Sequence, residues 1–146
     1  MQGAHTVLEA PLLVLRLKGV VKLSEVQFFK LCGLNDDLRL ERTSKGDIVV
    51  RPPEGGESGR ISFDLPTLLG PWVHADGTGI GFGSSAGFTL PSGAVRSPDL
   101  SWVKRARWGA LTQEQRERFP PLCPDFVVEV RSRTDRLADQ QAKMQE

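Results

Sequence analysis

The sequence has little of several features that would narrow its class at once. Its 146 residues include two cysteines, Cys32 and Cys123, which form neither a CxxC pair nor a disulfide framework and suit a reducing cytoplasm. Two histidines, His5 and His74, lie in separate contexts without metal-ligand spacing. The net charge of +1 excludes a uniformly cationic nucleic-acid coat, so any contact with a polyanion must come from local clusters. No apolar run approaches the roughly 18 residues that cross a membrane, so we expect a cytoplasmic protein with no membrane contact.

The first third of the chain predicts a strand, a helix and a hairpin. Residues 12–17 are typical of a strand or extended arm. Residues 23–33 predict a short amphipathic helix, in which Ser24 and Gln27 have the spacing of a capping box and Gly33 is placed to end the helix. Two β-prone runs separated by Lys-Gly then predict a hairpin, at residues 38–42 and 47–53.

The middle of the chain predicts a loop and a second helix. Residues 54–59 are rich in glycine and are expected to form a flexible loop. Apolar residues recur at helical spacing from 61 to 72, and Pro66 should kink that helix or break it. Residues 81–86 match the glycine pattern of a dinucleotide site, but the residues that follow are strand-like rather than helical, so a plain turn is favoured.

The second half of the chain alternates short strands with two helices. A glycine-rich meander of antiparallel strands precedes a polar helix that Thr112 can cap, and a final helix follows the most apolar strand, with Ser132 or Thr134 as its cap. We therefore expect an α/β (α+β) domain, with a mixed, mainly antiparallel central sheet flanked by helices. The domain is expected at residues 23–146, after an N-terminal strand or arm at residues 1–22.

The run FVVEV at residues 126–130 raises a specific question, because Glu129 interrupts a β-branched and aromatic strand that is typical of burial on both faces. An unpaired carboxylate there would be costly, so we expect a metal ion, a basic partner or a solvent-facing edge. Asp99 also lies in a strand context, and adjacent strands stand about 5 Å apart. The two carboxylates could therefore share one Mg²⁺ or Mn²⁺, with Lys143 nearby to orient water or stabilise charge on a phosphate.

Two blocks, GFTLPSGAVRSPDLSWV and PDFVVEVRSRTDRLADQQAKM, resemble the signature blocks of the Uma-type putative restriction-endonuclease family. These are small bacterial proteins of the PD-(D/E)XK nuclease superfamily, with a restriction-endonuclease-like fold. The resemblance implies that Asp99 and Glu129 are metal ligands, that Lys143 is the active-site lysine, and that Glu41 is an additional carboxylate of the site. It also implies a DNA substrate, and nucleases of this type commonly pair to cut two strands, which is compatible with a homodimer.

The sequence departs from that family in two ways. Arg131 stands two residues after the second acid, where the superfamily has a lysine, and a guanidinium can bind phosphate but cannot act as a base at neutral pH. Lys143 must then take the lysine's role from the last helix. Family members also continue into further strands after this helix, so we expect the domain to be shortened at its C-terminal end.

Each candidate residue also has an ordinary structural explanation. Asp99 could cap a turn after Pro98, Glu129 could face solvent from an edge strand, and Glu41 could be an exposed charge at a strand end. Asp139 lies four residues before Lys143, so the two could form a surface ion pair. Three arginines could grip a phosphate backbone or simply be solvated, namely Arg131, Arg133 and Arg136.

The leading hypothesis is therefore a metal-dependent nuclease that hydrolyses phosphodiester bonds of nucleic acid. The alternative is a non-catalytic module on the same fold that binds nucleic acid or protein. A net charge near zero also keeps open an interaction protein with no affinity for nucleic acid.

Overall fold

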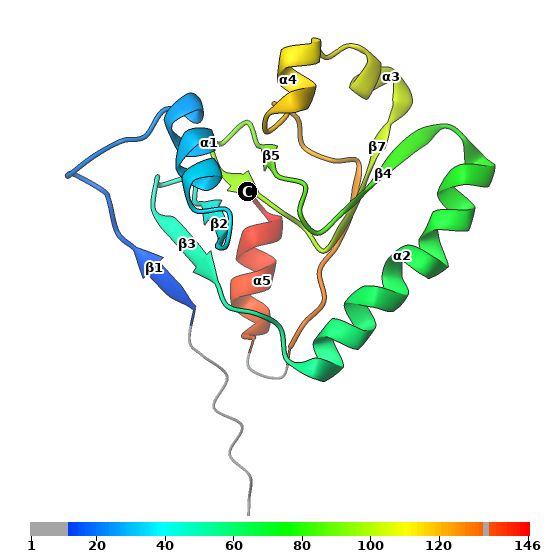
Figure 1. The fold of residues 1–146 in the computed structure, drawn as a ribbon, viewed down its shortest axis with the longest axis horizontal. Helices are drawn as coiled ribbons and strands as arrows, with labels where there is room; N and C mark the ends of the chain where they lie inside the picture. Colours follow the sequence, from blue (N-terminus) through cyan, green and yellow to red (C-terminus); the bar gives the residue numbers. More distant parts are fainter. Residues whose placement is uncertain (1–11, 133–134) are drawn as a thin grey trace, which may run out of the picture.

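The computed structural model describes residues 12–132 and 135–146 and contains two antiparallel sheets, one of five strands and one of three, with five helices around them (Figure 1). The expected α+β class with antiparallel sheets and flanking helices is confirmed. The strands are divided between two sheets rather than forming one. The chain passes from the larger sheet to the smaller one through residues 97–99.

The five-stranded sheet is built around the predicted hairpin. Its strand order is β1-β3-β2-β6-β5, comprising β1 (Leu13–Leu15), β3 (Ile48–Arg51), β2 (Arg39–Arg42), β6 (Val95–Arg96) and β5 (Phe88–Thr89). In the hairpin, Glu41 lies opposite Val49. The turn closes through Gly46, whose φ of 88° is easily reached only without a side chain.

The three-stranded sheet has the order β4-β7-β8, comprising β4 (Gly79–Gly83), β7 (Leu100–Lys104) and β8 (Phe126–Val128). The glycine-rich stretch that includes β4 continues through a turn into β5, as expected of a plain turn. One expectation is wrong, because β8 is an edge strand of three residues, with Phe126 51% exposed. Its β-branched residues therefore do not indicate burial on both faces.

Helix α1 (Glu25–Leu34) covers one side of the larger sheet. Its capping box is formed as predicted, since the Gln27 amide donates to Ser24 Oγ at 3.2 Å and the Ser24 amide donates to Gln27 Oε1 at 2.8 Å. Phe28 is fully buried against Ile48 and Val95. Gly33 does not end the helix, because the Asn35 amide bonds back to Cys32 and the last turn is completed at Leu34.

Helix α2 (Gly56–Asp76) is longer than the sequence predicts. The expected loop at 54–59 is wrong from Gly56 onward, because Arg60 pairs with Glu57 at 2.7 Å and with Asp64 at 2.9 Å, spacings that stabilise a helix. The helix also continues through Pro66. It lies at the side of the molecule opposite β1 (Figure 1), and several of its large apolar side chains are exposed.

Three short helices complete the fold, namely α3 (Arg105–Gly109), α4 (Gln113–Glu117) and α5 (Leu137–Met144). Thr112 caps α4 as predicted. The cap predicted for the last helix is wrong at Ser132, because its amide donates to Asp135 Oδ2 at 2.8 Å and the helix begins only after Arg136. Thr134 lies outside the described residues.

The core has two parts that follow the two sheets. One is centred on Phe88 and Val103, and the other on Phe28 and Val95. Among the described residues, no helix is both long enough and apolar enough to cross a membrane.

The smaller sheet has a steric requirement for glycine at position 79. A Cβ there would overlap the Trp102 indole ring, whereas a Cβ at Gly83, in the same strand, would meet no atom within 4 Å. We predict that Gly79→Ala lowers the free energy of unfolding by about 1–3 kcal/mol, measured by urea denaturation. Gly83→Ala is the matched control. Equal stability of the two variants would contradict this packing.

Candidate active site at the junction of the two sheets

The candidate site lies where the chain crosses between the sheets. Glu41, on β2, is 2% exposed although it carries a carboxylate. Asp99, at the end of the crossing segment, is 5% exposed. Helix α5 lies between β2 and the segment that follows β8 (Figure 1), and Lys143 on this helix contacts both sides. Residues far apart in the sequence are thus brought to one place.

Glu41 is surrounded by cationic side chains from three elements and by one backbone amide of the crossing segment. Its Oε1 accepts from Lys143 Nζ at 3.2 Å and from the Ser97 amide at 3.0 Å. Its Oε2 lies 3.4 Å from Arg51 Nε and 3.2 Å from Arg96 Nη1. Burial alone would raise the pKa of Glu41, but Lys143, Arg51, the Ser97 amide and Arg96 together outweigh it and hold the pKa below its ordinary value.

Asp99 and Glu129 lie next to each other across the end of a β-ladder. Leu100 pairs with Val128, and the same antiparallel register carried one position further places Asp99 opposite Glu129. Directly opposite residues have Cβ atoms about 4.5–5.5 Å apart. Asp99 Oδ2 accepts the Val130 amide at 2.7 Å, while Asp99 Oδ1 is buried without a hydrogen-bond partner among the described residues.

Glu129 has fewer compensating contacts than Glu41. Its side chain is 6% exposed, its Oε1 accepts from Lys143 Nζ at 2.7 Å, and its Oε2 lies 3.8 Å from Arg51 Nη2. Burial raises the pKa of Glu129, the nearby Asp99 also raises it, and the attraction of Lys143 and Arg51 only partly offsets them. The site therefore contains one stabilised carboxylate and one whose ionised form is costly.

Lys143 reaches these carboxylates because α5 turns one face toward β8. Gln140, one turn earlier on that face, donates from Nε2 to the Val130 carbonyl at 3.4 Å. The Lys143 side chain is 11% exposed and bonds Glu129 and Glu41. The surface ion pair with Asp139 that sequence spacing allows is therefore not the arrangement found in the described part of the chain.

Further charged residues close the site on the side of β6. Glu146 Oε2 accepts from Arg96 Nε at 2.6 Å and lies 2.6 Å from Arg96 Nη2 in the same ion pair. Arg96 in turn contacts Glu41. Ser44, in the β2–β3 turn, donates to Glu146 Oε1 at 3.2 Å. The residues after α5 are thereby fastened to the larger sheet.

The donor set fits a divalent cation in chemical terms. Hard oxygen ligands are what Mg²⁺ and Mn²⁺ prefer, and Mg²⁺ sites commonly use one or two carboxylates. Asp99 Oδ1 is a buried oxygen without a partner among the described residues, and the pKa of Glu129 is raised by its burial and by Asp99. A cation shared by the two would relieve both costs. Within the described ranges, no group of three or more His, Cys, Asp or Glu side chains is arranged to hold a metal.

The structure brings some of the predicted site residues together but not all of them. Asp99, Glu129, Lys143 and Glu41 come together. The expectation of an exposed Glu41 at a strand end is wrong, because three hydrogen-bond donors and the Arg51 guanidinium surround its carboxylate. Arg131 is exposed. Arg133 lies outside the described residues.

Sequence reasoning missed Arg51, Arg96 and Glu146. Arg51 could have been found, because the hairpin register places Val49 opposite Glu41 and Arg51 lies two residues further along the same face. Arg96 depends on the long-range pairing of β2 with β6, which no local pattern shows.

One family model matches most of the chain. The model of the Uma2 family, described as putative restriction endonucleases, matches residues 26–146. The chain belongs to this family. Uma2 membership indicates a nuclease and implies nucleic acid as the partner, and enzymes with restriction-endonuclease-like folds generally use divalent metals. No curated protein shows significant similarity to the chain.

Glu41 should be a main source of stability at neutral pH. We predict that Glu41→Gln lowers the free energy of unfolding by about 3 kcal/mol or more, because it leaves buried cations without their carboxylate. Since the pKa of Glu41 is lowered by folding, its contribution is present above the ordinary value of about 4.3 and is lost as the pH falls through the folded-state value. Urea denaturation across this pH range measures it. Glu114→Gln, in an exposed ion pair with Arg118, is the control.

The contribution of Glu129 to the free energy of unfolding should change with pH in the opposite direction to that of Glu41. Because folding raises its pKa, stability is lost as the pH rises from about 4.3 through the folded-state value. We predict that Glu129→Gln removes this loss, so the stability of the variant relative to wild type increases over that rise in pH. The same denaturation series measures it. A difference that is independent of pH would show that burial of the ionised carboxylate is not costly.

Proposed function

We propose that this chain hydrolyses phosphodiester bonds of DNA, with Mg²⁺ or Mn²⁺ as its cofactor. The observation that carries the proposal is that Asp99 and the Glu129 side chain, 5% and 6% exposed, lie just beyond the end of the β7–β8 ladder. The ladder register carried one residue further sets them opposite each other, and Lys143 Nζ is 2.7 Å from Glu129. Membership of the Uma2 family supports the reaction class.

Asp99 and Glu129 are the proposed metal ligands. Asp99 would offer Oδ1, the oxygen without a partner among the described residues, while its Oδ2 is held by the Val130 amide. Glu129 would offer its carboxylate from the position opposite. A divalent ion bound there would supply a water activated for attack and would neutralise charge on the phosphoryl oxygens.

Lys143 is proposed to act as an N–H donor toward the attacking water or the phosphate oxygens. Its ammonium already bonds Glu129 and Glu41, which fixes its position without any substrate. A donor fixed in advance costs little reorganisation when charge builds on the phosphate. Arg131 and Arg133 are proposed to contact the backbone of the nucleic acid beside the site.

Glu41 and Arg51 complete the proposed machinery. Glu41 acts through Lys143, Arg51 and Arg96, which it holds by ion pairs, so we assign it as a positioning residue. Arg51 is 25% exposed and lies between Glu41 and Glu129. Its guanidinium can bind phosphate oxygens in a bidentate manner, and we propose that it turns toward substrate phosphate.

A non-catalytic module that binds nucleic acid is the second candidate. It is favoured by the ion pairs that Lys143 and Arg51 form with Glu129, one of the two proposed metal ligands. In that case the charges would serve the fold, and nucleic acid would bind without being cut.

Cleavage of plasmid and single-stranded DNA in Mg²⁺ or Mn²⁺ separates the two candidates. We predict that Asp99→Ala and Glu129→Ala abolish cutting and that Lys143→Ala slows it by about 10²–10³-fold, as expected for loss of one donor to developing charge. Lys104→Ala, an exposed lysine on β7, should cut at the wild-type rate.

Calorimetric titration with Mn²⁺ gives a readout that does not depend on cutting. Wild type should bind the ion, and Asp99→Asn and Glu129→Gln should lose that binding while remaining folded by circular dichroism. Salt-sensitive DNA binding by a wild-type protein that neither cuts nor takes up Mn²⁺ would support the non-catalytic module instead.

A further inference from the structure

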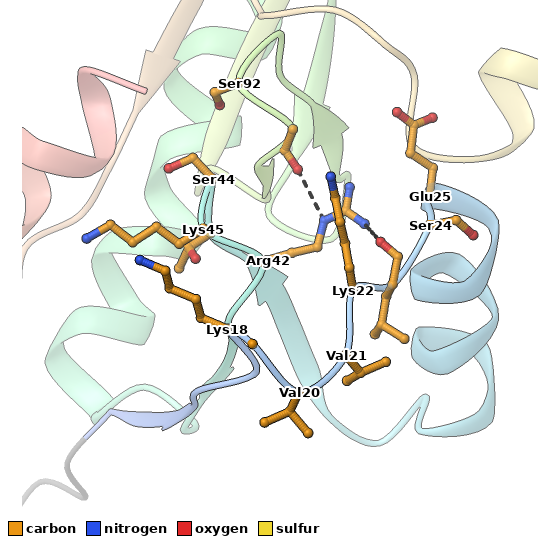
Figure 2. Close-up of a pocket in the computed structure, with 15 residues that line it drawn as sticks. Lys18, Val20, Val21, Lys22, Ser24, Glu25, Arg42, Ser44, Lys45 and Ser92 are labelled. Atoms are coloured by element: carbon orange, nitrogen blue, oxygen red, sulfur yellow. Dashed lines mark hydrogen bonds between the residues drawn. The ribbon is translucent and has the colours of Figure 1, made fainter.

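A groove of about 640 Å³ lies at the turn end of the β2–β3 hairpin, apart from the carboxylate site (Figure 2). It is lined by residues 18–25, which lead into α1, by residues 42–46 of the hairpin turn, and by residues 92–93. We call it the basic groove, because three lysines and one arginine line it, namely Lys18, Lys22, Lys45 and Arg42.

The three lysines of the basic groove carry charge that their surroundings do not neutralise. Lys18, Lys22 and Lys45 are exposed, and none of them has an ion pair with any of the residues that the structure describes. Glu25 is the single carboxylate among the described lining residues. For a chain with a net charge of +1, this concentration of free cations is a local feature that attracts an anion.

Arg42 differs from the three lysines, because its guanidinium is buried and held in place by hydrogen bonds at the base of the groove. It is 6% exposed, its Nε donates to the Gly93 carbonyl and its Nη1 to the Leu23 carbonyl, both at 3.1 Å, and its guanidinium lies 5.3 Å from the centre of the Phe28 ring. These bonds join the three lining segments. In Figure 2 the Lys18 and Lys45 side chains extend in the same direction, and Lys22 extends beside Arg42.

We propose that the basic groove binds the phosphate backbone of nucleic acid on the strand that flanks the cleaved bond. The choice of nucleic acid as ligand rests on the proposed function. Ser44 in the groove and Glu41 in the candidate site are three residues apart, which is at most about 10 Å of extended chain. A duplex strand rises about 3.4 Å per nucleotide, so this separation along the chain corresponds to about three nucleotides.

A chain of contacts joins the groove to the candidate site. Ser44 bonds Glu146, Glu146 pairs with Arg96, and Arg96 pairs with Glu41. The groove wall and the carboxylates thus stand on one connected frame. Phosphates bound in the groove would fix the register of the strand without reading its sequence, as backbone contacts do in other nucleic-acid complexes.

The salt dependence of DNA binding tests the proposal. We compare Lys22→Ala/Lys45→Ala, which removes one lysine from each of two groove segments, with the control Lys30→Ala/Lys104→Ala, which removes the same charge at exposed positions outside the groove. Binding of a fluorescent duplex is followed by anisotropy in EDTA, so that cutting does not interfere. The slope of log K against log salt should become shallower by about 0.9 for each lost phosphate contact, and the control should keep the wild-type slope.

The outcomes separate this proposal from the proposed function. A groove variant with the slope of wild type, or one no shallower than the control, overturns the groove even when Asp99→Ala abolishes cutting. If the groove variant has a shallower slope but the wild-type protein never cuts DNA, DNA binding by the groove is supported and the proposed nuclease activity is contradicted. Binding to vesicles that contain anionic lipid tests a membrane as the ligand instead, since Val20 and Val21 are exposed at the rim of the groove. If the groove variant loses vesicle binding while its DNA binding is unchanged, the groove binds a membrane and the proposal is overturned.

Discussion

The arrangement depends on a buried carboxylate, Glu41, which holds cations from separate parts of the chain at one point. Lys143 comes from α5, Arg51 from β3 and Arg96 from β6, and each lies within 3.4 Å of the Glu41 carboxylate. An ionised carboxylate with 2% exposure is tolerable only with such partners. Because Lys143 also bonds Glu129, the contact that stabilises the fold is the same one that places the lysine beside the proposed metal ligands.

Paired and unpaired charges lie in two different places in this molecule. The candidate site collects carboxylates and cations that neutralise one another, while the basic groove keeps lysines without ion pairs in the described part of the chain. A net charge of +1 conceals both features. The division suits the two proposals made above, in which the basic groove holds a nucleic-acid strand by backbone contacts and hydrolysis occurs at the carboxylates.

Local chemistry explains what the sequence could predict. The capping box at Ser24, the cap at Thr112 and the hairpin at Gly46 all depend on residues close together in the chain, and all are found. The predicted antiparallel meander is found only for β5 and β6, because β4 pairs with β7 in the smaller sheet. Helix α2 extends beyond its predicted start despite the glycines there, and Arg60 pairs with Glu57 and Asp64 in its first turns. The sequence overestimates the burial of β8, because apolar composition does not distinguish an edge strand from a central one.

The candidate site could be predicted only in part, and the resemblance to a family supplied most of it. Asp99 and Glu129 stand out as carboxylates in strand contexts, but their placement opposite each other depends on the β7–β8 register.

The most direct test of the proposed metal site is a crystal structure of the protein with Mn²⁺, in which anomalous scattering locates the ion. We predict an anomalous peak bonded to Asp99 Oδ1 and the Glu129 carboxylate, with Lys143 beside it. Mn²⁺ bound elsewhere, with Lys143 and Arg51 still paired to both glutamates, would contradict it.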